Sequence, residues 1–149
     1  MSKWGNKHKK LSKKLVLNYE ILKPINEVYY YLSDMDKYVL VHPIIYKIEK
    51  ISENNYSIFE ALKIGIFPIK VKYPAQIDCD FKAKKIKITA QVLKIIKIEI
   101  VFNLKTSGTK TSIEETITFK SFIPIGIFLA SIFKNQHQIL FNNIENHAT

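Results

Sequence analysis

Six consecutive segments between residues 44 and 119 alternate apolar and polar side chains with a period of two. This is the period of a β-strand, whose successive side chains point to opposite faces. Each segment has one apolar and one polar face, which is typical of antiparallel strands with one buried and one solvated side. The sequence therefore predicts six antiparallel strands, over residues 44–51, 56–64, 69–79, 85–92, 96–104 and 113–119.

Further elements flank this run. Residues 15–21 alternate like a strand, residues 25–33 follow a helical period, and residues 36–40 favour a second short helix. After Phe122 a helical period continues for roughly 20 residues. The order predicts one α+β domain over residues 15–149: a curved antiparallel sheet around a long C-terminal helix, with two short helices after the first strand and an apolar pocket beneath the sheet. Pro74 lacks a backbone donor, so its strand should lie at an edge or be bulged there.

The charge is concentrated at the start of the chain. Residues 1–14 hold six of the 23 lysines and no acid, whereas the net charge of the whole chain is +10. We expect a basic flexible tail there that can contact an anionic membrane surface. The chain has no arginine, the side chain best suited to reading base edges, which argues against sequence-specific nucleic-acid binding.

The remaining composition excludes several classes of site. A single cysteine, Cys79, rules out an internal disulfide and a multi-cysteine metal site, and we expect it to be a small buried apolar residue. The four histidines show no metal-ligand spacing, and no phosphate-binding or nucleotide-binding glycine motif is present, so no cofactor is expected. The longest apolar stretch, residues 122–133, is too short to span a bilayer, and we expect a soluble, cytoplasmic protein.

One stretch of the chain resembles a known superfamily. The pattern Leu22-Lys23-Pro24-Ile25-Asn26-Glu27-Val28-Tyr29, with Leu32, Asp34, Tyr38 and His42-Pro43, resembles the opening of START-like (SRPBCC) domains. These include polyketide cyclase/dehydrase-like proteins, coenzyme-Q-binding proteins and relatives of the birch-pollen allergen. The element order of residues 15–147 also matches their helix-grip fold of about seven strands. The resemblance implies a deep apolar cavity and a lipid-like, isoprenoid or polyketide ligand, but no particular reaction, because fold does not fix function.

Three ionisable residues are candidates for a general acid or base. Alternation turns Glu115 and Glu60 inward, where a carboxylate must be paired or neutralised. The alternative is that both are exposed or paired with lysine. His137 lies beside Gln136 near the apolar face of the final helix, and it either faces a ligand or touches solvent. His42 either closes the mouth of the pocket or packs at a turn.

The inward positions of the predicted strands and final helix form the expected ligand-binding lining. They are Tyr56, Ile58, Tyr73, Ile88, Ile100, Phe102, Glu115, Ile117, Ile132, Phe133, Gln136, His137 and Leu140. Two apolar connections, residues 65–68 and 123–128, either gate this pocket, touch a membrane or cap the core.

Three functions remain open from the sequence. The first is binding of a hydrophobic small molecule, as a carrier or a sensor. The second is an enzyme of the cyclase or dehydratase kind that uses Glu115, Glu60 or His137. The third is association with a membrane surface through the lysine-rich tail. Convergence of polar side chains in the cavity would favour the enzyme, and a uniformly apolar wall would favour the carrier.

Overall fold

The computed structural model describes residues 10–148, and its order of elements is the predicted one. Strand β1 (Leu11–Ile21) is followed by helices α1 (Ile25–Ser33) and α2 (Met35–Val41). Six strands come next, and helix α3 (Gly126–Asn146) ends the described chain. The six strands are β2 (Ile45–Ser52), β3 (Asn55–Ile64), β4 (Phe67–Asp80), β5 (Lys85–Val92), β6 (Ile96–Ser107) and β7 (Lys110–Ser121).

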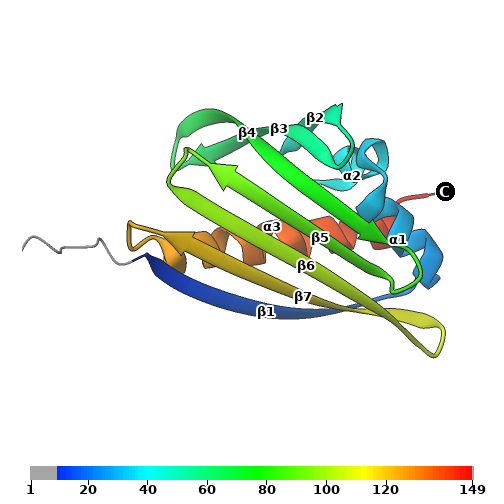
Figure 1. The fold of residues 1–149 in the computed structure, drawn as a ribbon. Helices are drawn as coiled ribbons and strands as arrows, with labels where there is room; N and C mark the ends of the chain where they lie inside the picture. Colours follow the sequence, from blue (N-terminus) through cyan, green and yellow to red (C-terminus); the bar gives the residue numbers. More distant parts are fainter. Residues whose placement is uncertain (1–9, 149) are drawn as a thin grey trace, which may run out of the picture.

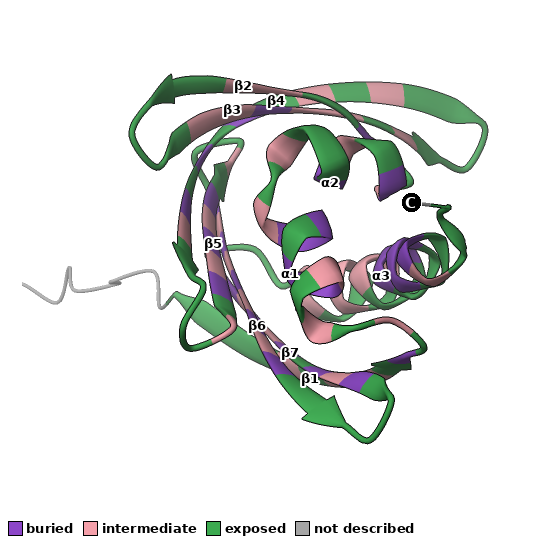
Figure 2. Cartoon of the chain, turned by 90° about the vertical axis from the view of Figure 1, so that its right-hand side faces the viewer, coloured by how far each residue is buried: buried purple, intermediate pink, exposed green. Residues whose placement is uncertain are grey.

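All seven strands form one antiparallel sheet in the order β1-β7-β6-β5-β4-β3-β2. The sheet curves around α3, which runs along its concave side (Figure 1). Figure 2, seen end-on, shows α1 and α2 within the same curve beside α3. Inward residues alternate with outward ones as the sequence predicted; in β7, for example, Ile113, Glu115, Ile117 and Phe119 are buried. The helix-grip fold expected from the sequence is therefore confirmed.

Strand β1 begins earlier than the sequence indicated. Residues 11–14 pair with residues 118–121 of β7, so the prediction that a flexible tail extends to Lys14 is wrong for these four residues. Leu11 and Ser12 are exposed at the sheet edge, and the backbone hydrogen bonds to β7, which no side-chain pattern reveals, keep the segment in the strand. The rest of the predicted tail, residues 1–9, lies outside the described residues.

Pro74 lies at a local edge of the sheet, as predicted. Strand β4 pairs with β3 along residues 67–76, but its pairing with β5 starts only at Ala75. Pro74 is opposite Ser57 of β3 and has no partner on β5. The missing backbone donor therefore leaves no gap in the ladder.

The two short helices close one end of the curve. Asp34 separates them and caps α2, since its Oδ1 accepts hydrogen bonds from the backbone N–H groups of Asp36 (3.0 Å) and Lys37 (3.2 Å). Helix α2 packs against β2 and α3. Asn143 of α3 donates a 2.8 Å hydrogen bond to the carbonyl oxygen of Val41 and so ties α3 to the end of α2. This arrangement brings the polar residues that end α2 next to the middle of α3.

Candidate functional site

A small cavity lies between α3, α2 and strands β2 to β6. Its volume is about 30 Å³, far below the several hundred Å³ of an ordinary small-molecule pocket. The predicted deep apolar pocket is therefore corrected in two ways: the side chains fill most of the space, and the wall is mixed rather than apolar. The lining residues are Tyr38, His42, Ile45, Ile48, Ile58, Glu60, Tyr73, Ile77, Ile88, Ala90, Ile98, Ile100, Phe133, Gln136 and His137.

The structure gathers about half of the predicted lining at this cavity. Ile58, Tyr73, Ile88, Ile100, Phe133, Gln136 and His137 line it, as does the candidate acid Glu60. Phe102, Ile117 and Leu140 are instead fully buried in the packed core. Ile132 is only partly buried on α3, and Tyr56 lines a separate groove with Ile51 and Gln76. Glu115 does not line the cavity, but it forms a hydrogen bond with His137, which does.

Six lining residues were missed from the sequence, and a seventh, His42, was expected either to close the mouth of the pocket or to pack at a turn. Ile77, Ala90 and Ile98 share the inward parity of their strands, so alternation could have included them. Ile45 and Ile48 lie on β2, whose pairing with β3 shifts register between Ile45 and Lys47, which breaks the simple alternation. Tyr38 and His42 come from the short α2 segment, and nothing in a seven-residue helix indicates which way it faces the sheet.

A buried pair joins β7 to α3. His137 Nδ1 donates a hydrogen bond to Glu115 Oε1, and the side chains are 1% and 0% exposed. The expectation that His137 touches solvent is thus wrong, and so is an exposed or lysine-paired Glu115. The second carboxylate oxygen, Oε2, is buried without a hydrogen-bond partner among residues 10–148. His137 thus lines the cavity while its Nδ1 is bonded to Glu115, which does not line it.

His42 lies next to His137, with the two ring centroids 6.0 Å apart and the rings nearly perpendicular. Its Nδ1 accepts backbone N–H groups from Ile44 (3.3 Å) and Ile45 (3.0 Å). Burial lowers the pKa of His42 well below its ordinary value, and the neighbouring His137 adds to the effect. The ring is therefore neutral with its proton on Nε2, so it can only donate from that nitrogen. His42 both packs at the turn after α2 and lines the cavity.

A second polar pair stands on the sheet side. Tyr73 of β4 donates its hydroxyl hydrogen bond to Glu60 Oε1 of β3. Burial raises the pKa of Glu60, and the hydrogen bond from Tyr73 and the nearby His137 oppose that rise. Burial, with the charge of Glu60, also holds the pKa of Tyr73 well above its ordinary range. A phenol and a carboxyl group are thus held in a largely apolar wall opposite the two histidines.

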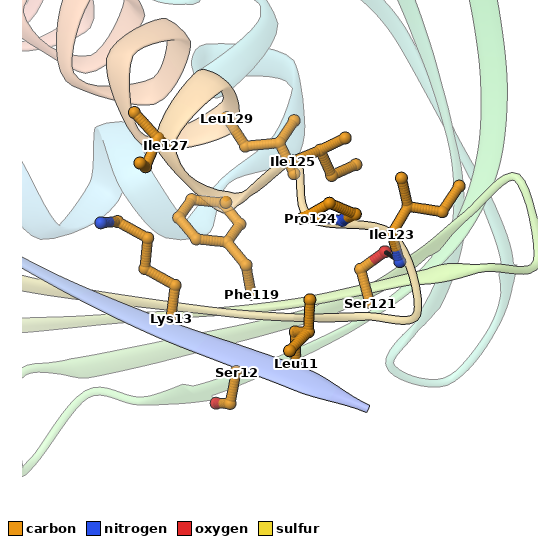
Figure 3. Close-up of a pocket in the computed structure, with 11 residues that line it drawn as sticks. Leu11, Ser12, Lys13, Phe119, Ser121, Ile123, Pro124, Ile125, Ile127 and Leu129 are labelled. Carbon is orange, nitrogen blue, oxygen red and sulfur yellow. Dashed lines mark hydrogen bonds between the residues drawn. The ribbon is translucent and has the colours of Figure 1, made fainter. Parts of the chain in front are cut away.

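A more open pocket of about 190 Å³ lies where α3 begins, between β1, β7 and the connection 122–125. Figure 3 shows the Phe119 ring between Lys13 on one side and Pro124 on the other, with Ile123, Ile125 and Leu129 around it. The ring of Phe119 packs against Phe133, with centroids 5.4 Å apart. Phe133 also lines the inner cavity, so this aromatic pair separates the two hollows.

The structure also places the single cysteine. Cys79 is exposed at the end of β4, so the prediction of a buried residue is wrong: it has the inward parity of β4 but lies past Gln76, the last residue of β4 in the register with β3. Partial burial, with Asp78, raises the pKa of its thiol. Among residues 10–148 no three metal-ligating side chains come together, and no helix is long and apolar enough to cross a membrane.

Comparison with solved structures identifies the fold. The structure of Ara h 8.0201 superposes with a TM-score of 0.73 at 17% identity, over 90% of this chain and 95% of that one. An aromatase/cyclase from Streptomyces also gives 0.73, at 12% identity over 90% and 92% of the chains. Norcoclaurine synthase from Thalictrum flavum gives 0.67, at 12% identity over 91% and 86%. No family model and no curated protein matches the sequence. The chain thus shares the helix-grip fold of these structures.

Proposed function

We propose that this helix-grip domain binds a small hydrophobic molecule that carries a hydroxyl or carbonyl group, in the space between α3 and the sheet. The observation that carries the proposal is the convergence of polar side chains from α2, β3, β4 and α3 on an otherwise isoleucine-rich wall. A uniformly apolar wall would fit a plain hydrocarbon. Here Glu60, Tyr73, His42 and Gln136 offer both donors and acceptors to one polar group of a ligand.

The ligand class follows from this mixed lining. Structures with the same fold include norcoclaurine synthase and an aromatase/cyclase, the second of which is named for forming aromatic rings. A lipid, isoprenoid or polyketide-like molecule with one oxygen function fits the wall best. Since the cavity holds only about 30 Å³, side chains must move to admit it. Phe133 is the best placed to do so, because it is only partly buried and lies between the cavity and the open pocket.

A matched pair of probes tests this proposal. 2-Naphthol and 2-methylnaphthalene have nearly the same shape, but only the first has a hydroxyl group. If the polar wall recognises that group, 2-naphthol binds about five- to tenfold more tightly, the worth of one net hydrogen bond. Tyr73→Phe combined with Glu60→Leu should reduce the difference, because two of the four polar groups are lost, whereas Tyr56→Phe, in the separate groove with Ile51 and Gln76, should keep it. Equal affinity of both probes for the unaltered chain would reject the proposed recognition.

The geometry of the two histidines supports a second candidate, an enzyme that moves a proton next to a carbonyl group. In the tautomer whose Nδ1–H is held by Glu115, the Nε2 of His137 is an acceptor, while His42 presents Nε2–H as a donor. A base and a hydrogen-bond donor on adjacent rings suit removal of a proton α to a carbonyl and stabilisation of the resulting enolate oxygen. Cyclisation and dehydration both begin with this step. Glu60 is the alternative base.

Exchange of α-hydrogens for deuterium separates the enzyme from the carrier. We expect the protein to accelerate exchange into 2-tetralone in D₂O, followed by proton NMR, and His137→Gln to slow it at least tenfold. Glu49→Gln, an exposed carboxylate on β2, serves as the control. If the protein binds the ketone without accelerating exchange, the site acts as a carrier or a sensor.

Two remaining expectations stay within this proposal. The first is contact of the lysine-rich start of the chain, residues 1–14, with an anionic surface; residues 1–9 of this segment lie outside the described part. A cytoplasmic location is tested by fractionation of cells that produce the full chain.

A further inference from the structure

One end of the domain carries an unusual number of exposed apolar side chains. The antiparallel register places three connections and the start of β1 at this end: Leu11 pairs with Ser121, and Ser121 pairs with Ile96. The β3–β4 turn lies at the same end because β4 runs antiparallel to β5. In Figure 1 this is the left-hand end, opposite α1 and the C terminus. We call it the loop-tip end, made of residues 10–13, 61–69, 92–97 and 120–129.

Several large apolar side chains at the loop-tip end are exposed to water. Ile66 is 87% exposed, Ile127 79% and Phe67 68%. Leu93, Phe122 and Phe128 are also more than half exposed. Leu93 and Lys94 both have positive φ, in a turn position where glycine or asparagine is the ordinary choice. A monomeric protein rarely leaves so many large apolar side chains together in water unless the surface binds something.

The charge of this end is one-sided. The four segments contain Lys10, Lys13, Lys63, Lys94, Lys97 and Lys120 and no aspartate or glutamate. All acids of the chain therefore lie elsewhere, for example Asp34, Asp36 and Glu27 around α1 and α2 at the opposite end. Lys10 extends over the exposed ring of Phe122, with its ammonium group 6.0 Å from the ring centroid. Apolar tips are thus interspersed with lysines in segments that contain no acid.

We propose that the loop-tip end docks on the surface of an anionic lipid bilayer. Apolar side chains at the tips enter the boundary between headgroups and acyl chains, and lysines around them meet the anionic headgroups. The same charge opposes self-association, because two copies meeting through this end would bring like charges together. The open pocket at the start of α3 lies within this surface, since Leu11, Ile123 and Ile127 belong to both. Docking by this end does not depend on what the inner cavity binds.

The fluorescence of a tryptophan placed at a loop tip tests most directly whether this end enters the bilayer. In the full chain with Trp4→Phe, which removes the only tryptophan, Phe67→Trp places a reporter at a loop tip. We expect its emission to shift to the blue, and to be quenched by brominated acyl chains, with vesicles of phosphatidylcholine containing 30% phosphatidylserine. Leu40→Trp, an exposed position on α2 at the other end, should report no change. Binding through the lysine-rich first residues alone would leave both reporters in water and would overturn the proposal.

Sedimentation with the same vesicles measures how much the apolar side chains and the lysines each contribute to binding. Ile66→Ser with Ile127→Ser should lower the partition coefficient at least tenfold, and Lys63→Gln with Lys94→Gln by a similar factor. The matched controls are exposed positions at the opposite end: Leu22→Ser with Leu40→Ser, and Lys82→Gln with Lys105→Gln. They should change the partition coefficient by less than twofold. The proposal is wrong if the controls lose as much binding as the tip variants. It is also wrong if gel filtration shows a dimer that the Ile66 and Ile127 changes dissociate, since a second copy would then cover this end.

Discussion

The pair formed by Glu115 and His137 should couple the stability of β7 to that of α3. Both side chains are removed from water, and each supplies the hydrogen-bond partner of the other. Replacing Glu115 by Leu leaves the imidazole N–H buried without an acceptor, and His137→Phe leaves a buried carboxylate without its donor. An unpaired buried polar group costs about 1–3 kcal/mol and a stranded charge about 3–5 kcal/mol, so we expect each single change to cost about 3 kcal/mol.

The double variant Glu115→Leu with His137→Phe removes both polar groups and leaves an apolar contact beside Phe102 and Phe133. The double variant should lose less free energy of unfolding than the two single variants together, by about 2 kcal/mol or more. Urea unfolding at pH 7.5, followed by circular dichroism, gives all four free energies of unfolding. Glu114→Gln, the neighbouring exposed carboxylate, should change stability by less than about 0.5 kcal/mol. Additive single losses, within about 0.5 kcal/mol, would refute a direct contact between the two groups.

Four further predictions follow from particular contacts. The pKa of His42 in the folded chain lies well below its unfolded value of about 6.5, so the unfolded chain binds the proton first as the pH falls. The free energy of unfolding should therefore decrease below about pH 6.5, by up to about 1.4 kcal/mol per pH unit. Melting between pH 7.5 and 5.5 should show a flatter profile for His42→Asn, and parallel profiles would contradict the assignment. Leu140→Trp should cost about 1–3 kcal/mol, since Leu140 is fully buried in the core rather than at the cavity; unchanged melting would indicate a void there. Phe133→Ala should lower stability by about 3 kcal/mol yet raise 2-naphthol affinity, because it joins the cavity to the open pocket, and unchanged affinity would show that Phe133 does not restrict entry. Deleting residues 1–14 should lower the melting temperature by several degrees, since residues 11–14 pair with β7, and an unchanged temperature would show that this part of β1 contributes nothing.

The fold could be predicted because local patterns and global packing agree. Alternation in β5, β6 and β7 defines which side chains face α3, and the structure keeps that parity along each of them. The boundary of β1 could not be predicted. Its first residues carry lysines and exposed side chains, and only their backbone hydrogen bonds to β7 make them a strand.

The candidate site was only half predictable for a different reason. Parity indicates that Glu115 and Glu60 point inward, but partners distant in sequence decide what they meet. Glu115 meets His137 from α3, and Glu60 meets Tyr73 from the neighbouring strand. The volume of the cavity is set by how far large side chains such as Phe133 extend into the curve of the sheet. A pattern of apolar positions carries no information on that distance.

Binding of 2-naphthol observed residue by residue tests the central claim most directly. We expect saturable changes in the backbone amide NMR shifts of the cavity lining, chiefly Ile58, Tyr73, Ile98 and Gln136. The amides of Tyr56 and Gln76, in the separate groove that these residues form with Ile51, should not respond. Saturable changes confined to the cavity would establish a ligand site between α3 and the sheet. Changes that do not saturate, or that are limited to the exposed loop tips, would contradict it.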